Sequence, residues 1–313
     1  MKKKILVIAG PTASGKTALG AAMAKKLDGE VISADSMQIY KGMDIATAKP
    51  TPSEMDGIPH HLIDFVERTE NYSVAQYVED ASKKAEEIIA RGKMPIVVGG
   101  TGLYISSFMN NIVFAEIKSD ETLRKKLRDE AAEKGNEYLL NRLRLCDPVT
   151  AAELHENDLS RVVRALEVFE LTGKTMSELK KESRALKSPY DFIFTGITYS
   201  DRQTLYDRIN RRVDIMMEKG LLDEAHEIFL QRDTVKTAHQ AIGCKELAPY
   251  FDGVSTLDEC LEKIKQETRR YAKRQLTWFR HQDGISWITA EKNDDLNFFI
   301  KKCENIVAKN QLI

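Results

Sequence analysis

The sequence predicts an α/β protein with a parallel-sheet core and an all-helical insertion. Over the first hundred or so residues, short apolar runs alternate with stretches of helical spacing, which is typical of a doubly wound sheet. A glycine-rich loop directly follows the first apolar run, as in phosphate-binding α/β proteins. From residue 117 to 186 the strand-like runs disappear and charged helical segments follow one another, which indicates an insertion.

Local signals predict the elements of the core in order. The continuous apolar run at 5–9 is expected of a strand that is buried on both faces. A helix over 18–27 ends before Asp28 and Gly29, and the next strand is 31–34. Ser73 can cap a helix that runs to Arg91, and a strand at 96–98 ends in a Gly-Gly pair.

The later elements divide the chain into two domains. Within the insertion, helices are predicted at 121–134, 137–145 and 158–171. A strand at 191–199 returns to the core, and long amphipathic helices and a late strand at 285–289 follow. We therefore expect a core made of 1–116 and 187–313, and an insertion domain made of 117–186.

Composition excludes several classes of protein. The 313 residues carry 47 Lys+Arg and 48 Asp+Glu, so the net charge of −1 gives no support for a bulk nucleic-acid binder. No apolar run approaches the roughly 18 residues of a membrane span. The four cysteines are far apart and form no CxxC pair, which favours a reduced cytoplasmic protein without a zinc site.

The segment 10–17 reads Gly-Pro-Thr-Ala-Ser-Gly-Lys-Thr and matches the phosphate-loop pattern GxxxxGK[ST]. Its position after a strand and before a helix predicts a P-loop NTPase-like core, in which backbone N–H groups surround a phosphate. The predicted phosphate-binding residues are Gly10, Thr12, Ala13, Ser14, Gly15 and Lys16, and the Thr17 hydroxyl is the expected Mg²⁺ ligand. The motif is that of ATP-binding proteins, but the strand 96–98 ends without the acidic residue that NTP hydrolysis usually requires.

Three further side chains are expected in the same crevice, each with a simpler alternative. Asp35 directly follows the strand 31–34 and can act as a general base, or it can merely form a turn. Thr101 follows the next strand and borders the crevice, or it caps the helix that begins near Leu103. Arg212 lies in an otherwise apolar helical row and either clamps a polyanion, with help from Arg208, or reaches out to solvent.

Two helices combine an apolar row with a basic row. In the insertion, Val162, Leu166 and Phe169 form the packing row, and Arg161 and Arg164 lie on another face. Near the C-terminus, Ile264, Tyr271 and Trp278 are in register for packing, and the basic row consists of Arg270, Lys273 and Arg274, followed by Arg280. Such rows are usually solvated surface, but two of them beside a phosphate loop favour an extended anionic partner. The pair His60 and His61 lacks a third ligand at metal-binding spacing, which favours a structural role.

Motifs along nearly the whole chain resemble those of the bacterial tRNA dimethylallyltransferases, the tRNA isopentenyltransferase or IPP transferase family. The motifs, read in order, are Gly-Pro-Thr-Ala-Ser-Gly-Lys-Thr at 10–17, Asp-Ser-Met-Gln-Ile-Tyr at 35–40, Asp-Ile-Ala-Thr-Ala-Lys-Pro at 44–50, Pro-His-His-Leu-Ile-Asp at 59–64, Gly-Gly-Thr-Gly-Leu-Tyr at 99–104, Arg-Ala-Leu-Glu-Val at 164–168, Ala-Ile-Gly-Cys-Lys-Glu at 241–246 and Ala-Lys-Arg-Gln-Leu-Thr-Trp-Phe-Arg at 272–280. One departure is Ala46, where the family usually has glycine; only a small local effect is expected.

The resemblance implies an activity and roles for these residues. The enzyme would transfer a dimethylallyl group from dimethylallyl diphosphate to the exocyclic amine of the adenosine at tRNA position 37, beside the anticodon, with Asp35 and Thr101 as catalytic residues. The diphosphate would be bound by residues 10–17, Arg212 and Mg²⁺. The residues that match tRNA-contacting positions are Ser36, Met37, Gln38, Thr101, Arg124, Ser160, Arg161, Arg164, Gln240 and Lys245; to these we add the basic row Arg270, Lys273 and Arg274. The insertion would hold the anticodon stem-loop.

Three alternatives remain at this point. An adenylate isopentenyltransferase uses the same donor on a free nucleotide, but it needs neither the insertion nor the basic rows. A P-loop small-molecule kinase would consume ATP in proportion to its product. A non-catalytic RNA-binding module would not depend on Asp35. We expect a cytoplasmic monomer with tRNA and dimethylallyl diphosphate as partners and no contact with a membrane.

Overall fold

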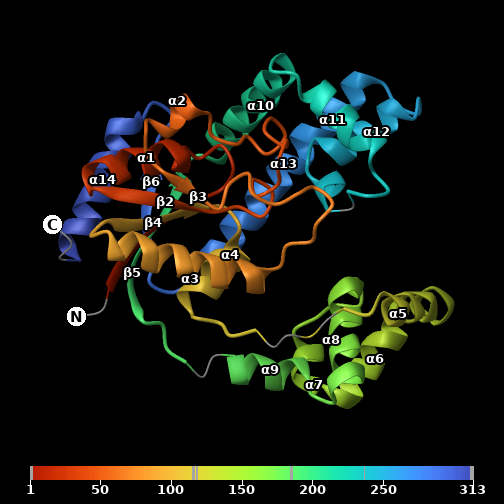
Figure 1. Ribbon diagram of the computed structural model, residues 1–313. Coiled ribbons are helices and arrows are strands. Elements are labelled where there is room, and N and C mark those ends of the chain that lie inside the picture. The colour runs from red at the N-terminus through yellow and green to blue at the C-terminus, as the bar shows by residue number, and fades with distance from the viewer. Residues whose placement is uncertain (1–2, 115–116, 118, 184–185, 236, 311–313) are drawn as a thin grey trace. The chain divides into compact units, whose positions relative to one another are not determined.

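The computed structural model describes residues 3–114, 117, 119–183, 186–235 and 237–310, and Figure 1 shows the course of the chain. Its residues group into two compact units: unit 1 comprises Met1–Met109 and Ser188–Ile313, and unit 2 comprises Asn110–Lys187. The sequence expectation placed the first boundary at 116/117 rather than at 109/110. Because none of the described residues between 109 and 121 belongs to a helix or strand, no change of periodicity marks that boundary in the sequence.

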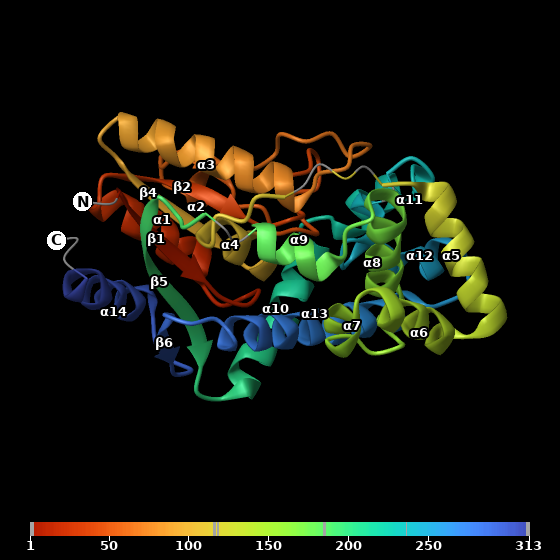
Figure 2. The ribbon, with the colours of Figure 1, turned by 90° about the horizontal axis from the view of Figure 1, so that it is seen from below.

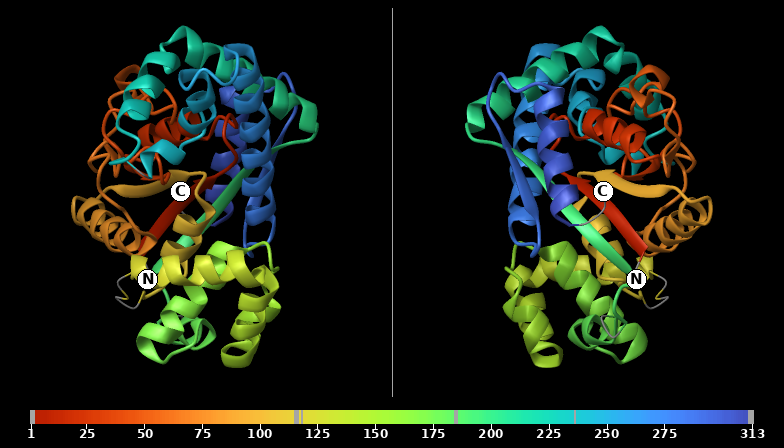
Figure 3. Two further views of the ribbon diagram at one scale, coloured as in Figure 1. Left: turned by 90° about the vertical axis from the view of Figure 1, so that its right-hand side faces the viewer. Right: turned by 90° about the vertical axis from the view of Figure 1, so that its left-hand side faces the viewer.

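Unit 1 contains a parallel sheet, as predicted from the alternating apolar runs. Among the described residues it has six strands in the order β3-β2-β4-β1-β5-β6. Their bounds are β1 Lys3–Ala9, β2 Gly29–Ala34, β3 His60–His61, β4 Met94–Gly99, β5 Tyr190–Tyr199 and β6 Ser286–Ala290. In the central register Val7 lies opposite Val97 of β4 and Phe194 of β5, and Figure 3 shows β1 and β5 side by side.

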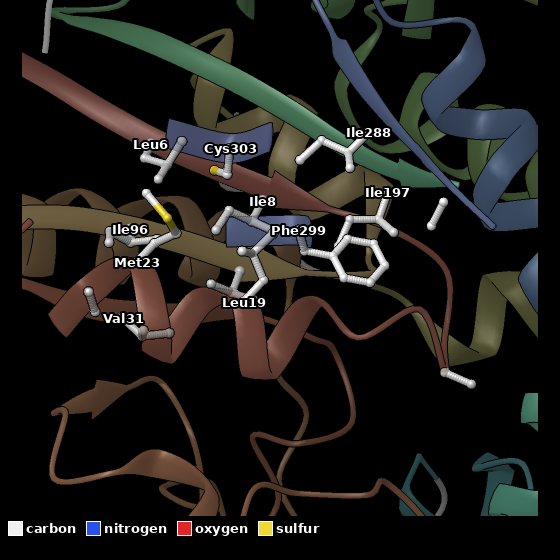
Figure 4. Packing of buried hydrophobic residues seen from close by; sticks show 14 of the residues in the cluster. Leu6, Ile8, Leu19, Met23, Val31, Ile96, Ile197, Ile288, Phe299 and Cys303 are labelled. Carbon is white, nitrogen blue, oxygen red and sulfur yellow. The ribbon is translucent and has the colours of Figure 1, made fainter. Parts of the chain in front are cut away.

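Helices cover both faces of the sheet (Figure 1). On one face lie α1 (Lys16–Lys26) and α14 (Leu296–Lys309); on the other lie α3 (Val74–Ala90), α4 (Gly102–Met109) and α13 (Leu257–Arg280). Figure 4 shows the first interface, where Leu6 and Ile8 of β1 pack with Leu19 of α1 and Phe299 of α14. On the second face, aromatic rings of α4 and α13 meet rings of β5, with Phe108 and Phe192 at 5.6 Å and Phe194 and Phe279 at 6.4 Å.

The remaining helices of unit 1 build a second core beyond the carboxyl ends of the strands. They are α10 (Arg202–Glu218), α11 (Leu221–Leu230), the 3-10 helix η1 (Ala238–Gln240) and α12 (Cys244–Phe251); the short helix α2 (Pro52–Met55) contacts α1 instead. Ile39 and Met43 from the loop after β2 are buried in this core with Leu221 of α11 and Ile264 of α13. Distant parts of the chain therefore hold the loop that follows β2.

Unit 2 is helical throughout its regular elements, as predicted. It consists of α5 (Glu121–Lys134), α6 (Asn136–Cys146), α7 (Pro148–Ala152), α8 (Leu159–Thr172) and α9 (Met176–Ser183). In Figure 2, α5, α6 and α8 pack together, and they bury Leu127, Leu139, Leu143, Val162 and Leu166. In the described part of the chain, neither unit has a helix that is long and apolar enough to cross a membrane.

Candidate active site

Three loops meet at one edge of the sheet because β4 is hydrogen-bonded to both β1 and β2. The phosphate loop follows β1, Thr101 follows β4 and Asp35 follows β2. The loops after β1 and β2 border a cavity of about 310 Å³, whereas Thr101 is not among the residues that line it. Of the residues selected from the sequence, Thr12, Lys16, Thr17, Asp35, Ser36, Met37, Gln38, Arg212, Gln240, Lys245 and Arg274 line this cavity.

The phosphate loop adopts a conformation that its glycines permit. Gly15 has φ +94°, which a side chain would strain, and it leads directly into α1. Gly10 is closely packed, since a Cβ there would lie 2.8 Å from the Ser14 hydroxyl oxygen. The Ser14 hydroxyl is buried and has no hydrogen-bond partner among the described residues. The loop conformation therefore depends on glycine at both positions.

Side chains from distant elements hold the backbone of this loop. The Nε of Arg208 in α10 donates to the Ala13 carbonyl at 2.9 Å, and the guanidinium lies over the ring of Tyr199. Ala13 itself has φ +61°, an uncommon conformation for a residue with a side chain. The Tyr199 hydroxyl donates to the Ser14 carbonyl at 3.3 Å. Arg208, which we expected to assist Arg212 with an anion, braces the loop here.

Lys16 and Arg212 bring two positive charges to the cavity. The ammonium of Lys16 donates to the Pro11 carbonyl at 3.2 Å, and the guanidinium of Arg212 donates to the Ala48 carbonyl at 3.5 Å. Burial, together with the charge of Arg212, lowers the pKa of Lys16 to about 8, although Asp35 partly opposes the change. Burial likewise lowers the pKa of Arg212. Such a pair favours the binding of a multiply charged anion.

Asp35 and Thr101 are fixed by backbone groups rather than by each other. The Oδ1 of Asp35 accepts hydrogen bonds from the amides of Met37 at 2.9 Å and Gln38 at 3.3 Å. No described residue donates to its Oδ2. The Thr101 hydroxyl accepts from the Ser36 amide at 3.0 Å, so it orders the loop after Asp35 instead of capping α4. One carboxylate oxygen thus remains for a ligand.

Gln275 of α13 connects two of the three loops, and the sequence reasoning did not select it. Its side-chain oxygen accepts from the Thr12 amide at 2.9 Å, and its Nε2 donates to the Gly100 carbonyl at 2.9 Å. A Cβ at Gly100 would overlap this Nε2, so the Gly-Gly pair after β4 makes room for the glutamine. The sequence feature that could have identified Gln275 is its position one helical turn after Tyr271, which also lines the cavity. Burial, and then the charge of Asp35, raise the pKa of Tyr271.

The segment 44–48 forms another wall of the cavity and is held by Gln38 and Glu224. The Nε2 of Gln38 donates to the carbonyls of Thr47 and Ala48, each at 3.2 Å. The carboxylate of Glu224 in α11 accepts from the amides of residues 44, 45 and 46, each at 2.8 Å. Ala46 is not among the residues with positive φ, so its side chain fits at the position where the resemblance led us to expect glycine.

One part of the cavity wall is apolar. Its side chains come from α10, α11 and α13, and they are Ile209, Val213, Met216, Leu221 and Ile264. A site with cations on one part of its wall and aliphatic groups on another suits a ligand that is anionic at one end and apolar at the other. The carboxylate of Asp35 adds a base to that arrangement.

The chemistry of the donor atoms allows a magnesium ion at Thr17. The side chains of Thr17 and Asp35 both line the large cavity and a second cavity of about 20 Å³, which Ser33 also borders. Mg²⁺ prefers oxygen ligands and is commonly held by few protein groups together with phosphate oxygens and water. Thr17 thus fits the expected role, with phosphate oxygens as the other ligands.

The two histidines of the Pro-His-His motif form β3. The Nε2 of His61 lies 2.7 Å from the buried carboxylate of Glu30, which Arg91 also contacts at 2.6 Å. The Nδ1 of His60 lies 2.8 Å from the Ile58 carbonyl, and its Nε2 is buried beside the smaller cavity. The pair attaches the edge strand to β2, which agrees with a structural role.

The predicted RNA contacts of the insertion lie within unit 2. Arg124 of α5 and Arg164 of α8 bind opposite oxygens of the buried Glu167 carboxylate, at 3.0 and 2.6 Å. Burial alone raises the pKa of Glu167, but hydrogen bonds from both arginines and from the Asp120 amide outweigh it and hold the pKa below its usual value. Ser160 and Arg161 are exposed on α8. The two arginines are therefore fixed in direction, with part of each guanidinium at the surface.

The basic row of α13 is exposed, and only part of it borders the cavity. Arg274 lines the cavity, whereas Arg270 and Lys273 do not. Arg270 is paired with Glu267 at 2.6 Å. The members of the apolar row predicted for this helix are buried to different extents, since Trp278 is 38% exposed whereas Ile264 is buried. Trp278 lies near the C-terminal end of α13, where the helix has passed beyond the second core.

Comparisons with known proteins agree with this geometry. Residues 38–282 match a family model described as IPP transferase. The tRNA dimethylallyltransferase of Acetivibrio thermocellus is 50% identical over 305 residues, which cover 97% of each chain. The solved structure of the tRNA isopentenylpyrophosphate transferase from Bacillus halodurans has a TM-score of 0.73 at 44% identity, and covers 98% of this chain and 96% of its own. A eukaryotic dimethylallyltransferase, solved while acting on tRNA, gives a TM-score of 0.78 at 33% identity, over 98% of this chain and 78% of that one.

Proposed function

The chain belongs to the IPP transferase family, and from this premise we propose that it is a tRNA dimethylallyltransferase. In the proposed reaction, the dimethylallyl group of dimethylallyl diphosphate is transferred to the 6-amino group of the adenosine at tRNA position 37. Diphosphate and a proton are the other products. Relatives at 50% and 49% identity over nearly the whole chain carry the name tRNA dimethylallyltransferase.

The observation that carries the proposal is the composition of the 310 Å³ cavity. Lys16 and Arg212 suit the diphosphate, and the aliphatic side chains of α10, α11 and α13 suit the five-carbon chain. Asp35 lines the same cavity, so a nucleophile bound there has a base beside it.

The residues account for each part of the displacement. The adenine amine attacks the allylic carbon, the bond from that carbon to the diphosphate oxygen breaks, and the amine proton passes to the free carboxylate oxygen of Asp35. Loop amides and the two cations stabilise the charge that develops on the departing diphosphate. Thr101 keeps Asp35 in place indirectly, because it holds the Ser36 amide. The adenine must leave its stack to enter the cavity.

Magnesium and the RNA surface complete the proposal. We propose that Thr17 and the diphosphate hold Mg²⁺, which supplies further charge neutralisation when bound. The contacts to the anticodon stem-loop would come from Ser36, Met37, Gln38, Thr101, Gln240, Lys245, Arg270, Lys273 and Arg274 in unit 1 and from Arg124, Ser160, Arg161 and Arg164 in unit 2. That the enzyme is a cytoplasmic monomer stays a prediction.

The reaction itself is tested with purified enzyme, dimethylallyl diphosphate and two acceptors. We expect a stoichiometric product on an anticodon stem-loop RNA, without added ATP and with little product on free AMP. Modification of AMP alone would assign the chain to nucleotide prenylation. ATP consumption in proportion to product would instead identify a kinase.

The role of Asp35 is tested with Asp35→Asn, which keeps an oxygen that can accept the amides of Met37 and Gln38. Loss of a general base typically costs about 10²–10⁴-fold in turnover, so we expect a fall of at least about 100-fold with little change in RNA affinity. The control is Asp233→Asn, on an exposed turn after α11. Full turnover in Asp35→Asn would remove the base from the mechanism.

A further inference from the structure

Trp278 stands out among the side chains of α13 because it is a large aromatic group on a strongly basic surface. The segment 262–281 contains seven Lys or Arg residues and two Glu residues. Along the row of Ile264, Tyr271 and Trp278, the side chains pass from the core to the cavity wall and then to the surface, where Trp278 is 38% exposed. Packing in the core therefore does not account for the whole indole.

The indole lies directly beside the active-site loop that follows β4. A Cβ on Gly102 would overlap the five-membered ring of Trp278, so the glycine allows α4 and α13 to approach closely. Gly102 is adjacent to Thr101, whose hydroxyl holds the Ser36 amide. The neighbouring Leu103 is 46% exposed. The exposed part of Trp278 is thus next to the residues at which the target adenine would enter.

Cations precede this aromatic group at the spacing of one helical face. Arg270, Arg274 and Trp278 follow one another at intervals of four, so they form one row along α13. Arg274 also lines the cavity. Among the described residues no carboxylate forms an ion pair with Lys273 or Arg274. Two guanidiniums can bind phosphates and an exposed indole can stack on a base, so this row is complementary to a single RNA strand.

We propose that Trp278 is a stacking platform for an unpaired nucleobase of the RNA substrate, next to the adenosine that enters the cavity. The inference rests on the proposed function and adds to it a contact and a class of ligand group. Aromatic side chains commonly stack unpaired bases in this way, and each such contact is worth about 1–3 kcal/mol by alanine substitution. The partner surface is single-stranded RNA rather than duplex, because only an unstacked base exposes its face.

The chain offers a direct spectroscopic test because it contains two tryptophans, Trp278 and Trp287. Trp287 belongs to β6 and is partly buried. In Trp287→Phe the emission therefore comes from Trp278 alone. Titration with an anticodon stem-loop RNA should quench it, whereas the same titration of Trp278→Phe, which retains only Trp287, should leave the emission nearly unchanged. Unquenched Trp278 in a complex shown by filter binding would overturn the proposal.

A binding cycle separates stacking from a structural role of the indole. Trp278→Leu keeps apolar contact at Gly102 but cannot stack, and we expect its RNA Kd to rise by about 5- to 150-fold. Trp278→Phe should lose less. The second ligand is an RNA that lacks the base beside the target adenosine. We expect the wild type to bind this RNA more weakly than the intact RNA. Trp278→Leu should bind the two RNAs equally well. Equal losses in both proteins would contradict stacking.

The outcome is distinguishable from a failure of the proposed function. The same RNA and wild-type enzyme are tested for prenylation with dimethylallyl diphosphate. If the RNA is prenylated, but Trp278 is not quenched and the losses in the binding cycle are additive, the stacking proposal is wrong and the proposed activity is supported. Quenching without prenylation supports the RNA contact while contradicting the proposed reaction.

Discussion

Lys16 and Arg212 share one cavity, and among the described residues neither has a carboxylate within ion-pair distance. Burial and mutual repulsion lower the pKa of Lys16 to about 8, yet at neutral pH it stays mostly protonated. The folded protein therefore carries an electrostatic cost that an anionic ligand relieves. This is the common pattern of a binding site whose residues are arranged for the ligand rather than for stability.

Removing the charge of Lys16 should therefore stabilise the ligand-free protein while it abolishes function. We expect Lys16→Met to raise the free energy of unfolding at pH 7 by about 1–3 kcal/mol, since one pKa unit corresponds to about 1.4 kcal/mol. Its turnover should fall at least about 100-fold, because a cation on the departing diphosphate is lost. Urea denaturation and the prenylation assay measure the two effects.

The change of the free energy of unfolding with pH tests the same electrostatic cost of the Lys16 charge. The folded-state pKa of Lys16 is depressed, so wild-type stability rises with pH between about 8 and the ordinary value of 10.5, where only the unfolded chain still binds the proton. The advantage of Lys16→Met should shrink over that range in magnesium-free, donor-free buffer. Lys25→Met is the control, because Lys25 is exposed on the same helix. A destabilised Lys16→Met would contradict the assigned repulsion.

Among single residues, the sequence selected those whose place in the cavity follows from a local motif. It missed those whose place depends on how distant elements pack. Lys16, Thr17 and Asp35 were selected because a loop pattern or a strand end defines their place. Gln275 was not selected, because a glutamine on a basic helix looks the same in sequence whether it is exposed or bridges two loops that lie 175 and 263 residues away. Which turn of α13 approaches the phosphate loop depends on the packing of the whole unit.

Among the structural elements, the segment 44–48 depends most on distant groups. Three consecutive amides point at the Glu224 carboxylate, and Gln38 binds the carbonyls that follow. The backbone N–H of Gln38 in turn donates a hydrogen bond to the Oδ1 of Asp35. Hydrogen bonds, together with the backbone of the segment 44–48, thus link α11 to the Asp35 carboxylate, and we infer that Glu224 helps to position it.

Substitution of Glu224 tests this connection. In Glu224→Gln one oxygen is replaced by an amino group that cannot accept an amide, so at least one of the three hydrogen bonds is lost. We expect kcat/KM for the stem-loop RNA to fall by about 10-fold, in line with a lost charge-assisted bond of about 1.5–3 kcal/mol. Glu227→Gln, exposed on the same helix, is the control.

A double-mutant cycle distinguishes positioning from general destabilisation. If Glu224 acts through the loop, the effect of Glu224→Gln on kcat/KM should become smaller in a Gln38→Ala background. Fully additive losses would show that Glu224 does not act through Gln38. Unfolding midpoints of all variants serve to exclude loss of folded protein.

Elements marked by an apolar run or a helical periodicity were predicted well, and an element without such a pattern was not. The strands at 5–9, 31–34 and 96–98 and the helix capped by Ser73 are present, and Ser73 and Gln76 form a capping box. β3 has two residues and contains no apolar run, so nothing in its own sequence identifies it. Its pairing with β2 and the Glu30 contact of His61 define it, and both are tertiary interactions.

For the whole molecule, the near-zero net charge hides a strongly uneven distribution. The 47 basic and 48 acidic residues cancel in the sum, while the segment 262–281 has an excess of five positive charges. α13 covers one face of the sheet and α14 covers the other, and both helices expose cations. A specific RNA partner should therefore respond to the charges of α13 and not to those of α14.

The salt dependence of RNA binding measures how many cations neutralise phosphates. The slope of log K against log salt changes by about 0.7–0.9 for each phosphate contact removed. We expect Arg270→Ala and Lys273→Ala each to flatten the slope by about that amount, with a modest loss of affinity at low salt. Lys301→Ala, on the exposed side of α14, should leave the slope unchanged. If the α14 variant flattened the slope as much as the α13 variants, binding would follow total charge, and the basic row of α13 would be ordinary solvated surface.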